Sequence, residues 1–313
     1  MISPSCKVMS DLPYRSLSSY LREKFGCRVQ KISLDAGLSC PNRDTEKKGG
    51  CIYCNIRGSG TGSYTAGISL EEQIETQMAF MARRYKAGAF IAYFQSYSNT
   101  YADVRTLKGI YDTILSYPEI VGLAIGTRPD CIDREKLELI RSYSPDRLVW
   151  IEYGLQSADD ETLKRINRGH DVQTFIDAVN LTQEYNIRTC AHIIIGLPGE
   201  GMEQYVNTAR LIADLPVTDV KIHLLYIIKG TPLEDMYTKG IYRPMTMEEY
   251  ALAASYVLAH LREDLVIQRI TGDPHADELV APAWSLEKSR VRAAIVEKMD
   301  NLHLYQGCLC SKP

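Results

Sequence analysis

The sequence predicts an α/β protein, a partial (β/α)6 TIM-like barrel with a mainly helical C-terminal extension. Six apolar runs alternate with helical patterns, which is the order of parallel strands joined by helices. The runs are apolar almost throughout, as parallel strands covered on both faces are. Polar residues gather directly after the runs, and barrels of this kind carry their chemistry at the carboxyl ends of the strands.

Each expected element has its own signal. The apolar runs that predict strands cover residues 29–35, 89–95, 120–127, 147–156, 188–198 and 217–228. Between them, helical patterns cover about 69–85, 103–116, 133–143, 159–167 and 171–185, and a further one ends near 213. Ser69 and Glu72 form a capping-box pair at the start of the first pattern, and Asp133 is an expected N-cap.

Three segments follow from these patterns. Residues 1–30 form a basic N-terminal segment, residues 31–233 the barrel, and residues 234–313 a mainly helical extension in which 246–263 is the clearest helix. Residues 1–31 carry six Lys or Arg and only two Asp or Glu. This local excess suits either contacts with phosphates or a solvated helix face.

Composition narrows the class of protein. The chain has 313 residues, 45% of them hydrophobic, and a net charge of -3, so no global basic field indicates a nucleic-acid binder. It has no run of about 18 apolar residues and no apolar signal core, so we expect a cytoplasmic protein without membrane contact. The nine cysteines are odd in number and scattered, which favours metal binding or catalysis over a disulfide framework.

Three cysteines follow the first expected strand with the spacing C-x10-C-x2-C: Cys40, Cys51 and Cys54. A structural zinc site needs four ligands, so a fourth would have to come from Cys308, Cys310 or a histidine. A [4Fe–4S] cluster held by three thiolates keeps one iron open for a non-protein ligand. The spacing favours a reactive cluster, and a zinc-stabilised binding module without catalysis remains the alternative.

The cysteine stretch and several later motifs resemble the radical S-adenosylmethionine (SAM) superfamily. "CPNRD" and "GGCIYC" with their long first gap look like the YhcC/YtqA-type subfamily, and so do "KISLDAG", "AYFQSYSNTY", "IGTRPDCI", "EYGLQSADDETLKRINRGHD", "HIIIGLPGE" and "YIIKGTPL". The resemblance covers about residues 31–233. It implies a [4Fe–4S] cluster, SAM as cofactor, and hydrogen-atom abstraction by a 5′-deoxyadenosyl radical.

The resemblance also implies roles for single residues. The three cysteines would bind three irons, and the amino and carboxylate groups of SAM would bind the fourth. Arg168 would pair with the SAM carboxylate, which its planar fork matches. The remaining residues expected to contact SAM are Tyr53, Gln95, Ser96, Glu152, Gln156, His192, Ile194 and Gly196. Gln95 and Ser96 stand where the superfamily usually has a Gly-Gly-Glu-like motif, and His192 is equally compatible with an ordinary core position.

The sequence gives less information about the residues that bind the substrate than about those that bind the cofactors. The polar residues left at strand ends are Tyr97, Asn99, Tyr101, Arg128, Asp130, His223, Tyr226 and Lys229. Arg128 and Lys229 are candidates for holding an anion, and the alternative for Arg128 is an ion pair with Asp130 in a fixed turn.

The family likeness, which extends to the radical SAM part of the Elongator catalytic subunit, implies tRNA as partner. The expected reaction converts 5-carboxymethylaminomethyl-uridine, or its 2-thio form, at the wobble position to 5-aminomethyl-uridine. A reducing electron donor such as flavodoxin or ferredoxin is also implied. A radical SAM enzyme acting on a small metabolite is the main alternative.

Overall fold

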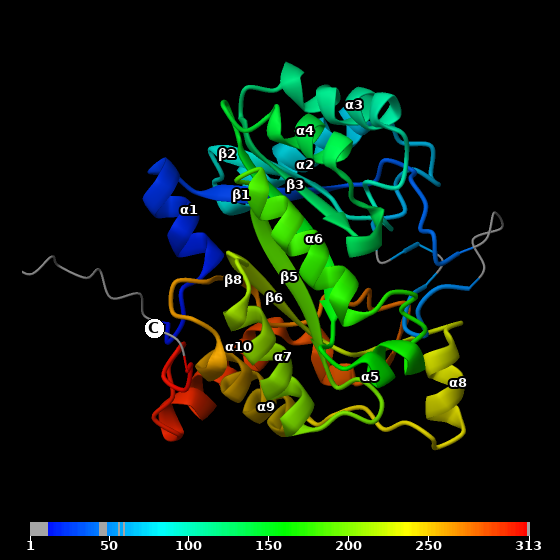
Figure 1. The fold of residues 1–313 in the computed structure, drawn as a ribbon, viewed down its shortest axis with the longest axis vertical. Coiled ribbons are helices and arrows are strands. Elements are labelled where there is room, and N and C mark those ends of the chain that lie inside the picture. Colours follow the sequence, from blue (N-terminus) through cyan, green and yellow to red (C-terminus); the bar gives the residue numbers. More distant parts are fainter. Residues whose placement is uncertain (1–11, 44–48, 56, 59, 312–313) are drawn as a thin grey trace, which may run out of the picture.

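The computed structural model describes residues 12–43, 49–55, 57–58 and 60–311. Residues 1–11 of the basic N-terminal segment, including Lys7, therefore lie outside the described residues. Figure 1 shows one curved sheet with helices on its outer side and further helices packed below it.

The sheet has seven parallel strands in the order β1-β2-β3-β4-β5-β6-β8. Their bounds are Val29–Leu34 (β1), Ala89–Phe94 (β2), Ile120–Thr127 (β3), Leu148–Gln156 (β4), Arg188–Ile195 (β5), Asp219–Leu224 (β6) and Val266–Arg269 (β8). This is a parallel half-barrel, as expected, with all six predicted strands present. Consecutive strands are neighbours, so their carboxyl ends meet along one rim.

The helices begin and end close to the expected positions. They are α1 Leu17–Phe25, α2 Leu70–Tyr85, α3 Val104–Asp112, α4 Arg134–Arg141, α5 Asp160–Arg165, α6 Val172–Glu184, α7 Met202–Asp214, α8 Pro232–Thr238, α9 Met247–His260 and α10 Lys288–Asn301. Both predicted N-caps are confirmed: Ser69 Oγ accepts a hydrogen bond from the Glu72 amide, and Asp133 accepts one from the Lys136 amide.

Two elements differ from the sequence-based expectation. The run 217–228 is not one strand, because β6 ends at Leu224 and the separate strand β7 (Ile227–Ile228) pairs with β9 (Leu279–Ala281) in an antiparallel ribbon. The extension expected to be mainly helical also supplies β8, which adds a seventh strand to the barrel.

The gap between the edge strands β1 and β8 is bridged without strand pairing. Helix α1 packs against both strands, and Ser16 forms an isolated bridge with Ile267. Inside the barrel, Lys31 on β1 donates to the side-chain oxygen of Gln268 on β8 at 2.6 Å.

The amino-terminal end of the barrel contains a buried polar and aromatic layer. Trp150 at the start of β4 donates its indole N–H to the Asp219 carboxylate at the start of β6, 3.1 Å away. Arg188 and Gln268 bind the same carboxylate. Trp150 and Asp219 are fully buried, so this layer is part of the packed interior of the barrel.

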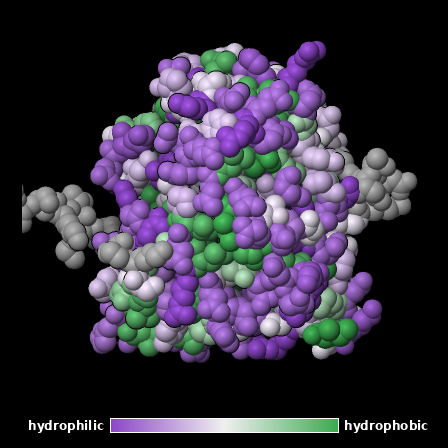
Figure 2. All heavy atoms as spheres, in the orientation of Figure 1, coloured by the Kyte–Doolittle hydropathy of each residue, from purple (hydrophilic) through white to green (hydrophobic). Residues whose placement is uncertain are grey.

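The outer face of the molecule is mostly hydrophilic, with a small group of hydrophobic residues near its centre in the orientation of Figure 1 (Figure 2). Within the described residues, no helix is both long and apolar enough to cross a membrane.

Candidate active site

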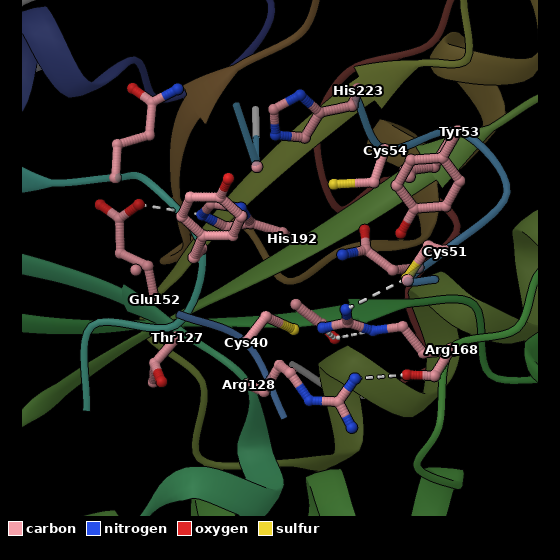
Figure 3. Close-up of a pocket in the computed structure, with 18 of the residues that line it drawn as sticks. Cys40, Cys51, Tyr53, Cys54, Thr127, Arg128, Glu152, Arg168, His192 and His223 are labelled. Carbon is pink, nitrogen blue, oxygen red and sulfur yellow. Dashed lines mark hydrogen bonds and ion pairs between the residues drawn. The ribbon is translucent and has the colours of Figure 1, made fainter. Parts of the chain in front are cut away.

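A cavity of about 280 Å³ lies at the carboxyl ends of the strands. It is lined by the three cysteines of the C-x10-C-x2-C motif and by side chains from the ends of β2, β4, β5, β6 and β8. Figure 3 shows Cys40, Cys51 and Cys54 around the same space as Glu152, His192 and His223. The residues predicted to carry the chemistry are thus brought together by the fold.

The cysteine loop is fastened to the barrel by backbone hydrogen bonds. The Ile52 amide donates to the Ile166 carbonyl at 3.0 Å, and the Ile52 carbonyl accepts from the Leu233 amide at 3.0 Å. The side chain of Asn167 donates to the Gly50 carbonyl at 2.7 Å. These contacts fix Cys51 and Cys54 from two sides.

The spacing of the three thiols is not that of a single zinc ion. Ligands of one zinc lie close together, since Zn–S bonds of about 2.3 Å place sulfur atoms about 3.8 Å apart. Among the described residues, the only three metal-ligating groups within 4.8 Å of one another are Glu152, Cys190 and His192. There, two lysine ammonium groups already neutralise the carboxylate. The three cysteines instead suit a larger cluster.

Arg168 lies beside the cysteines and is buried. Its guanidinium donates twice to the Gly154 carbonyl, at 2.7 and 3.2 Å, and once to Cys51 Sγ at 3.7 Å. Burial opposes its charge, yet the Cys51 and Tyr53 groups nearby raise the pKa of Arg168. A Cβ at Gly154 would lie 2.5 Å from Arg168 Nη2, so a larger residue here would force the guanidinium to move. Its predicted pairing with SAM stays a prediction.

Arg128 is engaged within the chain. It forms a bidentate ion pair with Asp130, at 2.7 and 2.8 Å, and donates to the carbonyls of Arg168 and Gly169. Four of its five guanidinium N–H groups therefore have partners. The ion pair with Asp130 in a fixed turn, which the sequence offered as the alternative role of Arg128, is thus present. The structure gives Arg128 a role in holding the Arg168 loop.

A buried charge cluster fills the barrel interior around Glu152. Lys31 Nζ lies 2.5 Å from one carboxylate oxygen, while Lys221 Nζ and His192 Nε2 bind the other, the histidine at 2.9 Å. Burial alone would raise the pKa of Glu152, but the charges of Lys221 and Lys31 outweigh it and hold this pKa well below its usual range. Burial lowers the pKa of Lys221 to about 7.

Two histidines lie next to this cluster and line the cavity. The rings of His192 and His223 are 5.3 Å apart between centroids. Burial and the Lys221 charge lower the pKa of His192 to about 4, and burial with the Arg269 charge holds the pKa of His223 well below its usual range. Both rings are therefore neutral at pH 7.

The other predicted residues divide into two groups. Those that line the cavity are Tyr53, Gln95, Gln156 and Ile194. Ser96, Gly196 and Lys229 are not among its lining residues. The buried hydroxyl of Ser96 packs against Gly60, and the Gly196 carbonyl accepts a hydrogen bond from Tyr242. Lys229 is exposed and donates to the Asp277 carbonyl.

The backbone is strained around the site. Tyr97, Gln156 and Asn167 have φ angles of 60°, 76° and 52°, in the left-handed region that non-glycine residues rarely adopt. Tyr97 and Gln156 line the cavity, and Asn167 precedes Arg168. Three other non-glycine residues with positive φ, Lys86, Asn186 and His303, lie outside the cavity lining.

Sequence reasoning missed several residues of the site. Lys31 was counted with the basic N-terminal stretch, but it points into the barrel, and Lys221, Tyr93 and Arg269 were not singled out. A signal was present for the two lysines, since each is a charge within an apolar strand, in "VQKISL" and "DVKIHL". Arg269 had none, because its strand was not predicted.

Comparison with known proteins agrees with this geometry. The Radical SAM superfamily matches residues 40–212, and the Radical_SAM C-terminal domain matches residues 217–301. The protein YtqA of Bacillus subtilis is 37% identical over 295 residues, which cover 94% of this chain and 92% of YtqA.

Two more distant similarities are one of sequence and one of structure. A tRNA uridine(34) acetyltransferase of Methanocaldococcus infernus is 28% identical over 192 residues, 60% of this chain and 35% of that protein. The solved structure of an N-terminally deleted Elp3 from the same archaeon superposes with a TM-score of 0.70 at 18% identity, covering 89% of this chain and 64% of the other. This second likeness is one of fold.

Proposed function

Because the chain belongs to the radical SAM superfamily, whose members use a [4Fe–4S] cluster and SAM, we propose that it modifies the wobble uridine of tRNA. The proposed reaction converts 5-carboxymethylaminomethyl-uridine, or its 2-thio form, to 5-aminomethyl-uridine. Cys40, Cys51 and Cys54 would hold the cluster. The cofactor pair supplies a radical that removes a hydrogen atom from an unactivated C–H bond.

One observation carries the proposal: the cavity that begins at the cysteines ends beside a cationic side chain whose ion pair is weak. Arg269 lines this end and lies 3.8 Å from Asp273, which Lys288 binds more closely, whereas Lys31 and Lys221 are bound to the buried carboxylate of Glu152. Such a side chain favours an anionic substrate group, and the carboxymethylaminomethyl group ends in a carboxylate. The named activity of the M. infernus relative on uridine 34 of tRNA supports the choice of RNA.

The substrate has one C–H position that suits the reaction. The methylene between the nitrogen and the carboxylate has the weakest C–H bonds, because nitrogen and carboxyl both stabilise a radical there. Removal of one hydrogen atom would leave a carbon radical, and transfer of one electron from it, for which an oxidised iron–sulfur cluster would be the acceptor, would give an iminium ion. Water then adds and the two-carbon fragment leaves as glyoxylate, with 5-aminomethyl-uridine as the other product. The base must leave its stack to reach the cavity.

The chain's own residues would position the substrate and exclude water. The buried Trp150–Asp219 pair fills the amino-terminal end of the barrel and would help to keep solvent from that end. Glu152 keeps both lysines in place, and the neutral His192 ring is held by the same carboxylate. We place this chemistry in the cytoplasm, with flavodoxin or ferredoxin as the donor of electrons.

A nucleoside profile of tRNA tests the proposal. Cells lacking this protein should accumulate 5-carboxymethylaminomethyl-uridine and lose 5-aminomethyl-uridine and nucleosides made from it. The wild-type chain should restore the profile, and a chain with Cys40, Cys51 and Cys54 changed to alanine should not. An unchanged profile in cells that otherwise make the carboxylated nucleoside would reject the proposal.

A second candidate is a small carboxylated metabolite as substrate. It is favoured by the C-terminal half of the chain, which lines the cavity with Tyr226, Ile228, Arg269 and Asp273 and covers the cysteine loop through Glu278. Binding of tRNA to the purified protein separates the two candidates.

A further inference from the structure

We propose that Arg269 and His223 form the site that binds the substrate's carboxylate. This inference rests on the proposed function and names the residues that recognise its substrate. Both side chains line the cavity, Arg269 from the end of β8 and His223 from β6.

Arg269 has an incompletely satisfied guanidinium. Within the part of the chain that the structure describes, its only charged partner is the Asp273 carboxylate at 3.8 Å, which is beyond hydrogen-bond distance. That carboxylate is bound more closely by Lys288. With 29% of its side chain exposed, Arg269 can turn its fork toward a ligand without breaking a strong ion pair.

His223 adds an unpaired nitrogen. Its Nε2 atom is buried and has no hydrogen-bond partner among the described residues. A buried polar atom left unpaired costs free energy, which a ligand that completes the hydrogen bond recovers. In the tautomer with the proton on Nε2, this atom donates to a carboxylate oxygen.

The surrounding charges select a monoanion. Lys31 and Lys221 are both bound to Glu152, so the two ammonium groups are already partnered. Arg269 and His223 offer the ligand one guanidinium fork and one imidazole N–H. This donor set matches the two oxygens of a carboxylate, which arginine binds bidentately, whereas a phosphate dianion needs more donors.

The two residues that the sequence suggested for this role are less suitable. Arg128 is committed to Asp130 and to two backbone carbonyls. Lys229 is exposed, bonded to the Asp277 carbonyl, and outside the set of lining residues. Recognition of the carboxylate thus moves to β8, the strand contributed by the C-terminal extension.

Binding of two short anticodon stem–loop RNAs to the anaerobic, cluster-loaded protein with SAM tests the inference. One RNA carries 5-carboxymethylaminomethyl-uridine, and the other carries 5-methylaminomethyl-uridine, which has no carboxylate. Arg269→Gln should lower the affinity for the first RNA by about ten- to a hundred-fold and leave the second unchanged. His223→Gln should act in the same direction with a smaller change. Arg290→Gln, an exposed change on α10, is the matched control.

The outcomes separate this site from the function. If wild type prefers the carboxylated RNA and Arg269→Gln loses that preference, with iron content and SAM affinity unchanged, the site is supported. If wild type and Arg269→Gln show the same preference, Arg269 does not bind the carboxylate and the proposed function still stands. If wild type binds both RNAs equally, this inference fails, and the nucleoside profile of cells lacking the protein decides separately whether the proposed function stands.

Discussion

Glu152 is the central residue of the buried charge cluster inside the barrel. It is 1% exposed and receives two ammonium groups and one imidazole. Buried ion pairs of this kind contribute little net stability as a set, but removal of one partner leaves uncompensated charge. Here that would leave Lys31 and Lys221 close together without an anion between them.

The variant Glu152→Gln is therefore expected to be strongly destabilised. We expect its free energy of unfolding to fall by about 3–5 kcal/mol, measured by urea unfolding of the anaerobic protein. Glu161→Gln is the control, because Glu161 forms an exposed pair with Lys164 and should change stability by less than about 1 kcal/mol. Equal free energies of unfolding for the two variants would show that the Glu152 carboxylate is not required to stabilise the two buried lysines.

At the scale of elements, the cysteine loop is held by parts of the chain far apart in sequence. Glu278, next to β9, accepts from Asn55 at 2.9 Å and pairs with Arg57 at 3.3 Å. The C-terminal extension thus stabilises the loop that carries Cys54. We call these two contacts of Glu278 the brace. It joins residues more than 200 positions apart in the sequence.

Glu278→Ala should loosen the loop without unfolding the barrel. We expect iron to be lost to a chelator several-fold faster than from wild type, while the thermal unfolding midpoint stays nearly unchanged. Glu248→Ala, which removes an exposed carboxylate from α9, serves as control and should release iron at the wild-type rate. If Glu278→Ala released iron at the wild-type rate, the contacts of Glu278 with Asn55 and Arg57 would not contribute to retention of the cluster.

The elements also show what sequence patterns can and cannot predict. The caps at Ser69 and Asp133 are local, so they were predicted correctly. Strand β8 was missed because four residues after a long helix give no readable periodicity. The Glu152 cluster was missed as a cluster because it joins β1, β4, β5 and β6, and their relative register is a property of the whole sheet.

At the scale of the whole molecule, the two halves of the chain build one site. The matches at residues 40–212 and 217–301 correspond to the cysteine-bearing part and to the part that supplies β8. The first part provides the thiols and Glu152, and the second provides Arg269. The division at residues 30 and 233 that the sequence suggested stays a prediction, although the cavity draws on both sides of residue 233.

The most direct test of the central claim is the fate of deuterium placed on the methylene between nitrogen and carboxylate in the carboxymethylaminomethyl group. The labelled tRNA is incubated anaerobically with the reduced, cluster-loaded protein and SAM, and 5′-deoxyadenosine is analysed by mass spectrometry. We predict that deuterium appears in 5′-deoxyadenosine in step with formation of 5-aminomethyl-uridine. Product formation with SAM consumed and all deuterium outside 5′-deoxyadenosine would contradict hydrogen abstraction at this position.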